Sequence, residues 1–156
     1  MSRTTNLSRP IIEALYSEAL VLADEVRAVF ALGIKDSPLN EDDAVRLALS
    51  TEGLKTTTRM MHILAWLLNQ RAFFSGELTE NQVRRHSELP DDRPADPEQL
   101  AMLETATCEL VEETTRLHRR IARLDEAWRQ QFEMVSPARA FQDRISREFN
   151  RLGDRA

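Results

Sequence analysis

The side chains best suited to metal or nucleophilic chemistry are three histidines, His62, His86 and His118, and one cysteine, Cys108. A di-iron helical bundle places a glutamate three residues before each ligating histidine, because the two side chains then share one helix face. The residues at those positions are Arg59, Val83 and Thr115. A lone cysteine without a cysteine–histidine spacing also argues against a structural zinc site. We therefore expect no metal, no cofactor and no catalytic residues.

Phosphate-binding and nucleic-acid-binding signals are also missing. The sequence contains neither G-x-x-x-x-G-K-[ST] nor G-x-G-x-x-G, whose glycines let the backbone approach phosphates closely. The net charge of −5 provides no overall basic field to attract nucleic acid or an acidic membrane. We expect neither as a partner.

The cellular compartment is indicated by cysteine usage and hydropathy. Cys108 has no second cysteine with which to form an intramolecular disulfide, which favours a reducing cytoplasm. The first residues lack the apolar segment of a signal peptide. The longest apolar run, Ile63 to Leu68, is far too short to cross a bilayer. We expect a cytoplasmic protein.

The elements that position these residues are predicted to be almost entirely helical. In 156 residues there are 4 glycines and 6 prolines, and alternating strand-like runs are scarce. Two long helices are predicted, one from Ser8 to near Gly33 and one from Asn40 to Ser75. Thr79 to Gln82 matches a capping box and opens a short helix, and a proline-rich loop follows it.

A third long helix is predicted to begin at Pro97, capped by Asp96. Its apolar and threonine positions alternate by three and four residues, as in a coiled-coil seam. The seam comprises Leu100, Leu103, Thr107, Leu110, Thr114, Leu117, Ile121, Leu124 and Trp128. We predict an antiparallel three-helix bundle over residues 1–136 and a C-terminal tail over residues 137–156.

The second helix is predicted to be apolar on two faces. One set steps along Met60, Ile63, Leu67 and Phe74, and the other is Leu54, Met61, Leu64 and Leu68. A helix on the surface of a bundle normally carries a single apolar stripe. The two other long helices can cover about one of these faces. We therefore predict that the second set forms a homodimer interface. Gly53, in the same helix, permits either a close helix contact or a bend.

The tail carries a separate apolar set, Phe141, Ile145, Phe149 and Leu152, spaced as on one helix face. Two arrangements remain open. The tail packs back on the bundle as an amphipathic helix, or it stays flexible and binds partner proteins.

The second helix also resembles a known family. Leu54-Lys-Thr-Thr-Thr-Arg-Met-Met, Ala65-Trp-Leu-Leu-x-Gln-Arg-Ala and the later Gly-Glu-Leu are similar to the alphaproteobacterial regulator of CtrA degradation (RcdA-like) adaptors. The first helix adds Ala14-Leu-Tyr-x-Glu-Ala-Leu-x-Leu-x-Asp-Glu-Val. The likeness extends from about Ile11 to Leu78.

This resemblance implies a dimeric three-helix bundle without enzymatic activity. It implies a role in delivering regulatory proteins to the ClpX–ClpP protease in cell-cycle control, with a response-regulator priming factor and client proteins as partners. Its motifs mark the scaffold, so they identify neither the client nor the surface that binds it. A homodimeric interaction or signalling scaffold unconnected with proteolysis is the main alternative, and a bundle enzyme or ligand carrier is the third.

Overall fold

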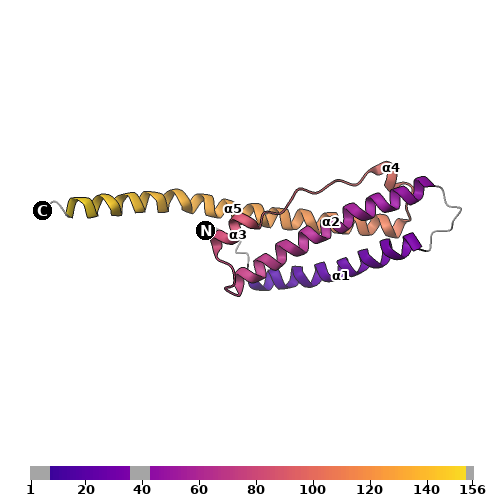
Figure 1. Cartoon of the computed structure of the whole chain (residues 1–156), viewed down its shortest axis with the longest axis horizontal. Coiled ribbons are helices and arrows are strands. Elements are labelled where there is room, and N and C mark those ends of the chain that lie inside the picture. The colour runs from indigo at the N-terminus through magenta and orange to yellow at the C-terminus, as the bar shows by residue number, and fades with distance from the viewer. Residues whose placement is uncertain (1–7, 36–42, 154–156) are drawn as a thin grey trace, which may run out of the picture.

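The computed structural model describes residues 8–35 and 43–153, and their side chains outside residues 32–35, 132–140, 143 and 147–153. The described elements are α1 (Arg9–Lys35), α2 (Asp43–Phe74), α3 (Glu80–His86), α4 (Pro97–Leu100) and α5 (Thr105–Gly153). The helices α1, α2 and the first part of α5 lie side by side as a bundle, and the rest of α5 extends beyond it (Figure 1). The predicted all-α three-helix bundle is confirmed.

The helix directions follow from residues 87–96, an irregular segment that we call the strap. The strap returns the chain along the bundle from α3 to α4 (Figure 1). Consequently α1 is antiparallel to both neighbours, whereas α2 and α5 run in the same direction. Hydrogen bonds between α2 and α5 agree with this. Arg59 of α2 bonds to Thr114 of α5, and Trp66, later in α2, bonds to Asp125, later in α5.

The ends of α1 and α2 largely match their sequence signals. The first helix runs to Lys35, slightly past the predicted stop at Gly33. The predicted cap at Asn40 lies outside the described residues, and α2 is described from Asp43. After Phe74 the chain turns at Gly76, whose φ of 84° is the left-handed conformation that favours glycine.

The capping box that opens α3 is confirmed. The backbone N–H of Gln82 donates to Thr79 Oγ1 at 3.3 Å, and the backbone N–H of Thr79 donates to Gln82 Oε1 at 2.9 Å. These two bonds satisfy donors that have no partner in the helix itself.

The third predicted helix is interrupted near its start, which corrects the sequence prediction. Asp96 caps it as expected, accepting from the backbone N–H of Glu98 at 3.0 Å. The helix from Pro97 nevertheless ends at Leu100, and α5 begins at Thr105. The backbone of Asp96 is bound to Glu52 of α2, so α4 is held against α2 and the chain turns before it can enter α5. Later, α5 continues through Pro137, and the division into bundle and tail there stays a prediction.

The core lies where α1, α2 and α5 meet, and α2 and α5 contribute faces that were predicted from their periodicity. The predicted α5 seam is buried at Thr107, Leu110, Thr114, Leu117, Ile121 and Trp128. The main apolar cluster comprises Ile12, Leu15, Ala19, Leu22, Val26, Phe30, Met60, Ile63, Trp66, Leu67, Leu89, Leu110, Val111, Leu117 and Ile121.

The helices α1 and α2 approach closely at Gly53. An added Cβ atom there would lie 2.7 Å from Phe30 Cδ1, so the glycine permits the contact. Towards the other end, Arg71 donates to Glu13 at 2.9 Å and lies 4.3 Å from the centre of the Tyr16 ring. The hydrogen bond to Glu13 raises the pKa of Arg71 above its ordinary value, so this contact stays charged.

Buried polar side chains hold the strap against α2 and α5. The Arg59 side chain is fully buried; its Nε donates to Asp92 at 2.8 Å and its Nη1 to Thr114 at 3.0 Å. Asp125 accepts from Trp66 Nε1 at 2.9 Å and from the backbone N–H of Leu89 at 3.2 Å. Buried polar groups need such partners, because an unpaired one loses its hydration without replacement. These bonds give the irregular strap a defined position.

Replacing Gly53 with alanine tests the close contact between α1 and α2. Alanine gains about 1 kcal/mol of helix propensity, whereas overpacking against Phe30 costs about 1–3 kcal/mol. We expect Gly53→Ala to lower the free energy of unfolding measured by urea denaturation. The double variant Gly53→Ala with Phe30→Leu should lose less unfolding free energy than the two single variants lose in sum, because the smaller leucine relieves the overpacking. A Gly53→Ala variant as stable as the natural protein would contradict the contact.

The Arg59–Asp92 pair should respond unequally to loss of its two members. Asp92→Ala leaves a fully buried guanidinium without its carboxylate, a change that costs about 3–5 kcal/mol. Arg59→Met removes the buried charge, and the Asp92 side chain, already 18% exposed, remains free to turn to water. We therefore expect the larger loss of urea stability from Asp92→Ala. Equal losses would show that the pair is hydrated in solution.

Candidate functional site

The side chains considered for chemistry lie apart in the structure. Across residues 8–35 and 43–153, no group of three or more histidine, cysteine and carboxylate side chains is placed to hold a metal ion, within the side chains described. The ring Nε2 of His118 is 3.0 Å from the carbonyl oxygen of Pro90 in the strap, and Cys108 Sγ is 3.2 Å from the carbonyl oxygen of Leu100. These contacts give His118 and Cys108 structural roles.

An exposed apolar stripe on α2 is the feature that the bundle leaves unexplained. We define the α2 stripe as Leu47, Leu54, Met61 and Leu68, with exposed fractions of 65%, 68%, 64% and 48%. Met60, Ile63 and Leu67, from the other predicted set, are buried in the core, and Phe74 is partly buried. Two apolar faces on α2 are therefore present, and the described residues cover one of them.

The structure changes the membership of the second set at two positions. Leu64 is half-buried and packs against the core, so it forms the edge of the stripe and not its centre. Leu47 belongs to the stripe but was missed, although it precedes Leu54 by seven residues, the same spacing that separates the other members. Leu47 was overlooked because it lies near the start of the helix, before the family-like motif that begins at Leu54.

The stripe has the shape of a helix-pairing surface. Its members recur every seven residues, the period of a coiled-coil seam. From Leu47 to Leu68 it extends about 31 Å along the helix axis. Between the large residues lie three small exposed ones, Ser50, Thr57 and Ala65. Small residues at these positions allow the backbone of another helix to approach closely.

A polar hollow flanks the stripe on the side of the strap. It has a volume of about 290 Å³ and is lined by Leu54 and His62 on α2 and by Asp91 and Arg93 on the strap, among others. The apolar stripe is therefore bordered by charged and ring-nitrogen groups. This combination, an apolar centre beside a polar rim, is typical of protein–protein interfaces.

The predicted tail set is described only in part. Phe141 and Ile145 are exposed on the part of α5 that extends beyond the bundle. The side chains of Phe149 and Leu152 lie outside the described residues. Phe141 and Ile145 therefore do not pack against the bundle of their own chain. Their role in binding a partner stays a prediction.

Among the helices described here, none is both long and apolar enough to cross a membrane.

Comparison with known proteins supports the predicted resemblance. A family model described as a protein of unknown function (DUF1465) matches residues 3–153. A search of curated proteins found no match. The crystal structure of RcdA from Caulobacter crescentus CB15 matches with a TM-score of 0.61 and 24% sequence identity, covering 80% of this chain and 96% of that one. The chain therefore belongs to the DUF1465 family, with the RcdA-like fold that its helical motifs predicted.

Proposed function

We propose that this protein is a non-enzymatic, cytoplasmic adaptor that acts as a homodimer and helps deliver regulatory proteins to the ClpX–ClpP protease in cell-cycle control. The exposed α2 stripe carries the proposal, because an adaptor works through binding surfaces and this one is large, apolar and regular. The RcdA-like fold and the adaptor role implied by the sequence resemblance support the proteolytic context.

We assign the α2 stripe to self-association. A two-fold symmetric dimer brings the same surface of both chains together, so the surface must complement itself. If two α2 helices pair antiparallel about an axis between Thr57 and Thr58, Leu54 meets the partner's Met61 and Leu47 meets the partner's Leu68. The small threonine side chains then lie at the crossing point, and the opposed helix dipoles attract each other.

Charged substitutions in the stripe should separate the subunits without unfolding them. Each exposed leucine or methionine contributes about 1.5–3 kcal/mol when buried, before the entropic cost of association. Sedimentation should show a dimer of the natural protein at micromolar concentration and a folded monomer of Leu54→Glu with Met61→Glu. Val21→Glu is the matched control, since Val21 is similarly exposed (61%) on a different face. A monomeric natural protein would exclude the assigned interface.

The proteolytic role is tested by measuring protein turnover. Purified protein should associate with ClpX in the presence of the response-regulator priming factor, and deletion of the gene should lengthen the half-lives of specific regulatory proteins. The dimer-deficient variant separates the two parts of the proposal, because it retains the fold. Unchanged half-lives after deletion, together with recovery of other partners, would favour the alternative, a homodimeric interaction or signalling scaffold outside proteolysis.

A further inference from the structure

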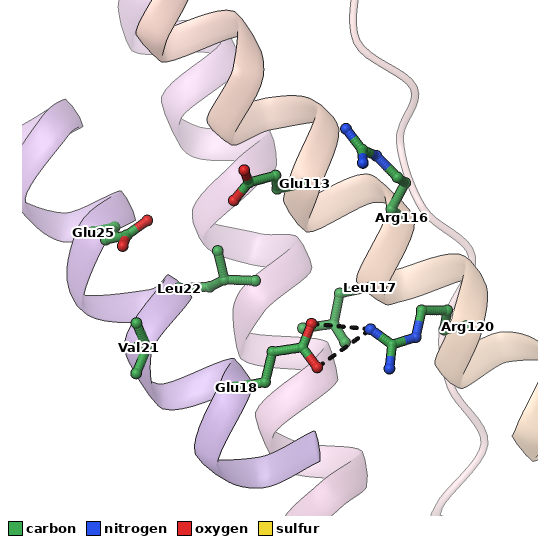
Figure 2. Close-up of a pocket in the computed structure, with 8 residues that line it drawn as sticks. All are labelled: Glu18, Val21, Leu22, Glu25, Glu113, Arg116, Leu117 and Arg120. Carbon is green, nitrogen blue, oxygen red and sulfur yellow. Dashed lines mark hydrogen bonds and ion pairs between the residues drawn. The ribbon is translucent and has the colours of Figure 1, made fainter. Parts of the chain in front are cut away.

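A groove between α1 and α5 is a second surface, separate from the α2 stripe. It consists of two adjoining hollows of about 510 Å³ each, which share Glu18 and Arg120. The strap runs along the α2–α5 side of the bundle (Figure 1), whereas all the residues that line the two hollows belong to α1 and α5. Figure 2 shows the two helices standing apart here, with the ion pair between Glu18 and Arg120 bridging them at 2.9 Å.

The groove carries exposed apolar side chains towards both of its ends. Val21 is 61% exposed on α1 in the first hollow, and Ile11 is 43% exposed in the second, whereas Leu22 and Leu117 between the helices are buried in the core (Figure 2). Further along, Ala14 and Ala127 line the second hollow, and their small side chains leave it open. From Glu113 to Ala127 the groove follows about 21 Å of α5, which is the length of about four helical turns.

Opposite charges lie at the two ends of the groove. Glu25 and Glu113 face it at one end, where Arg116 also lines it and pairs with Glu112 at 3.5 Å. Arg123 lines the other end. None of Glu25, Glu113 and Arg123 forms a salt bridge with another described residue. The charge at each end is therefore available to a ligand. A bound helix is oriented by such charges, because its N-terminus is partially positive and its C-terminus partially negative.

We propose that this groove binds an amphipathic helix of a partner protein, about four turns long, with basic residues in its N-terminal half and acidic residues in its C-terminal half. Its apolar face lies on Val21 and Ile11 and crosses the Glu18–Arg120 ion pair, its basic end lies near Glu25 and Glu113, and its acidic end lies near Arg123. The helix runs parallel to α5 and antiparallel to α1. This inference goes beyond the proposed function, because it depends on neither self-association nor proteolysis.

The tail of a second copy fits the groove less well. Residues 137–156 contain the arginines Arg139, Arg144, Arg147, Arg151 and Arg155 and the acids Asp143, Glu148 and Asp154, so five minus three leaves a net charge of +2. These charges are interspersed and do not run from basic to acidic. The tail would therefore place positive charge beside Arg123, which repels it.

Two synthetic peptides of about 16 residues, about 24 Å as helices, test the charge order. Both carry the same leucine stripe and composition. The first has lysines in its first two turns and glutamates in its last two, and the second has the reverse order. Fluorescence anisotropy with the full chain should show at least about tenfold tighter binding of the first peptide. Replacing its leucines with serines should weaken binding by about tenfold or more.

Exchanging the end charges of the groove provides the decisive variant. Glu25→Lys with Arg123→Glu changes two exposed residues and should reverse the preference, so that the second peptide binds more tightly. Arg85→Glu on α3 is the matched control, since Arg85 is exposed and outside the groove, and it should leave the preference unchanged.

Three results would overturn the proposal. The first is equal binding of the two peptides, or no binding of either up to about 200 µM. The second is an unchanged preference in the exchanged variant. The third is tighter binding by a peptide of residues 137–156 than by the first peptide, which would assign the groove to the tail of a second copy.

Discussion

The placement of α2 between its neighbours decides which surfaces this chain presents. Gly53 against Phe30 brings α1 close on one side, and Arg59 against Asp92 holds the strap on another. With these two sides covered, the face carrying Leu54 and Met61 is left in water. Four large apolar side chains at seven-residue intervals are costly there unless another helix covers them. This exposed face is the physical reason for proposing self-association.

Periodicity predicted the helices, and the prolines predicted the loop that forms the strap, but neither predicted the contacts that hold the strap in place. The α2 stripe could be found from the sequence because a second apolar set exceeded what two neighbours can cover, and the core face of α5 followed from its alternating spacing of three and four residues. Leu64 is half-buried at the edge of the stripe, and its place in the interface stays a prediction. The break between α4 and α5 depends on Glu52 binding the backbone of Asp96, a contact between residues distant in the sequence. Local patterns carry no information about such contacts.

The parallel run of α2 and α5 also has functional consequences. Because the strap returns the chain along the bundle, it covers the α2–α5 side with polar groups held by Asp125, His118 and Arg59. On the α1–α5 side, described residues of these two helices line a groove. The molecule thereby has two unlike surfaces, a regular apolar stripe suited to a copy of itself and a groove with charged ends suited to a different helix. The two surfaces lie on different sides of the bundle, so the two proposed contacts use different residues.

Cysteine cross-linking across the α2 stripe tests the central claim most directly. In a Cys108→Ala background, a chain with both Leu54→Cys and Met61→Cys should form disulfide-linked dimers on mild oxidation, because these positions face each other across the antiparallel pair. Either substitution alone should cross-link poorly. Failure of the double variant to cross-link, or equal cross-linking by Val21→Cys on the other face, would contradict a dimer formed through α2.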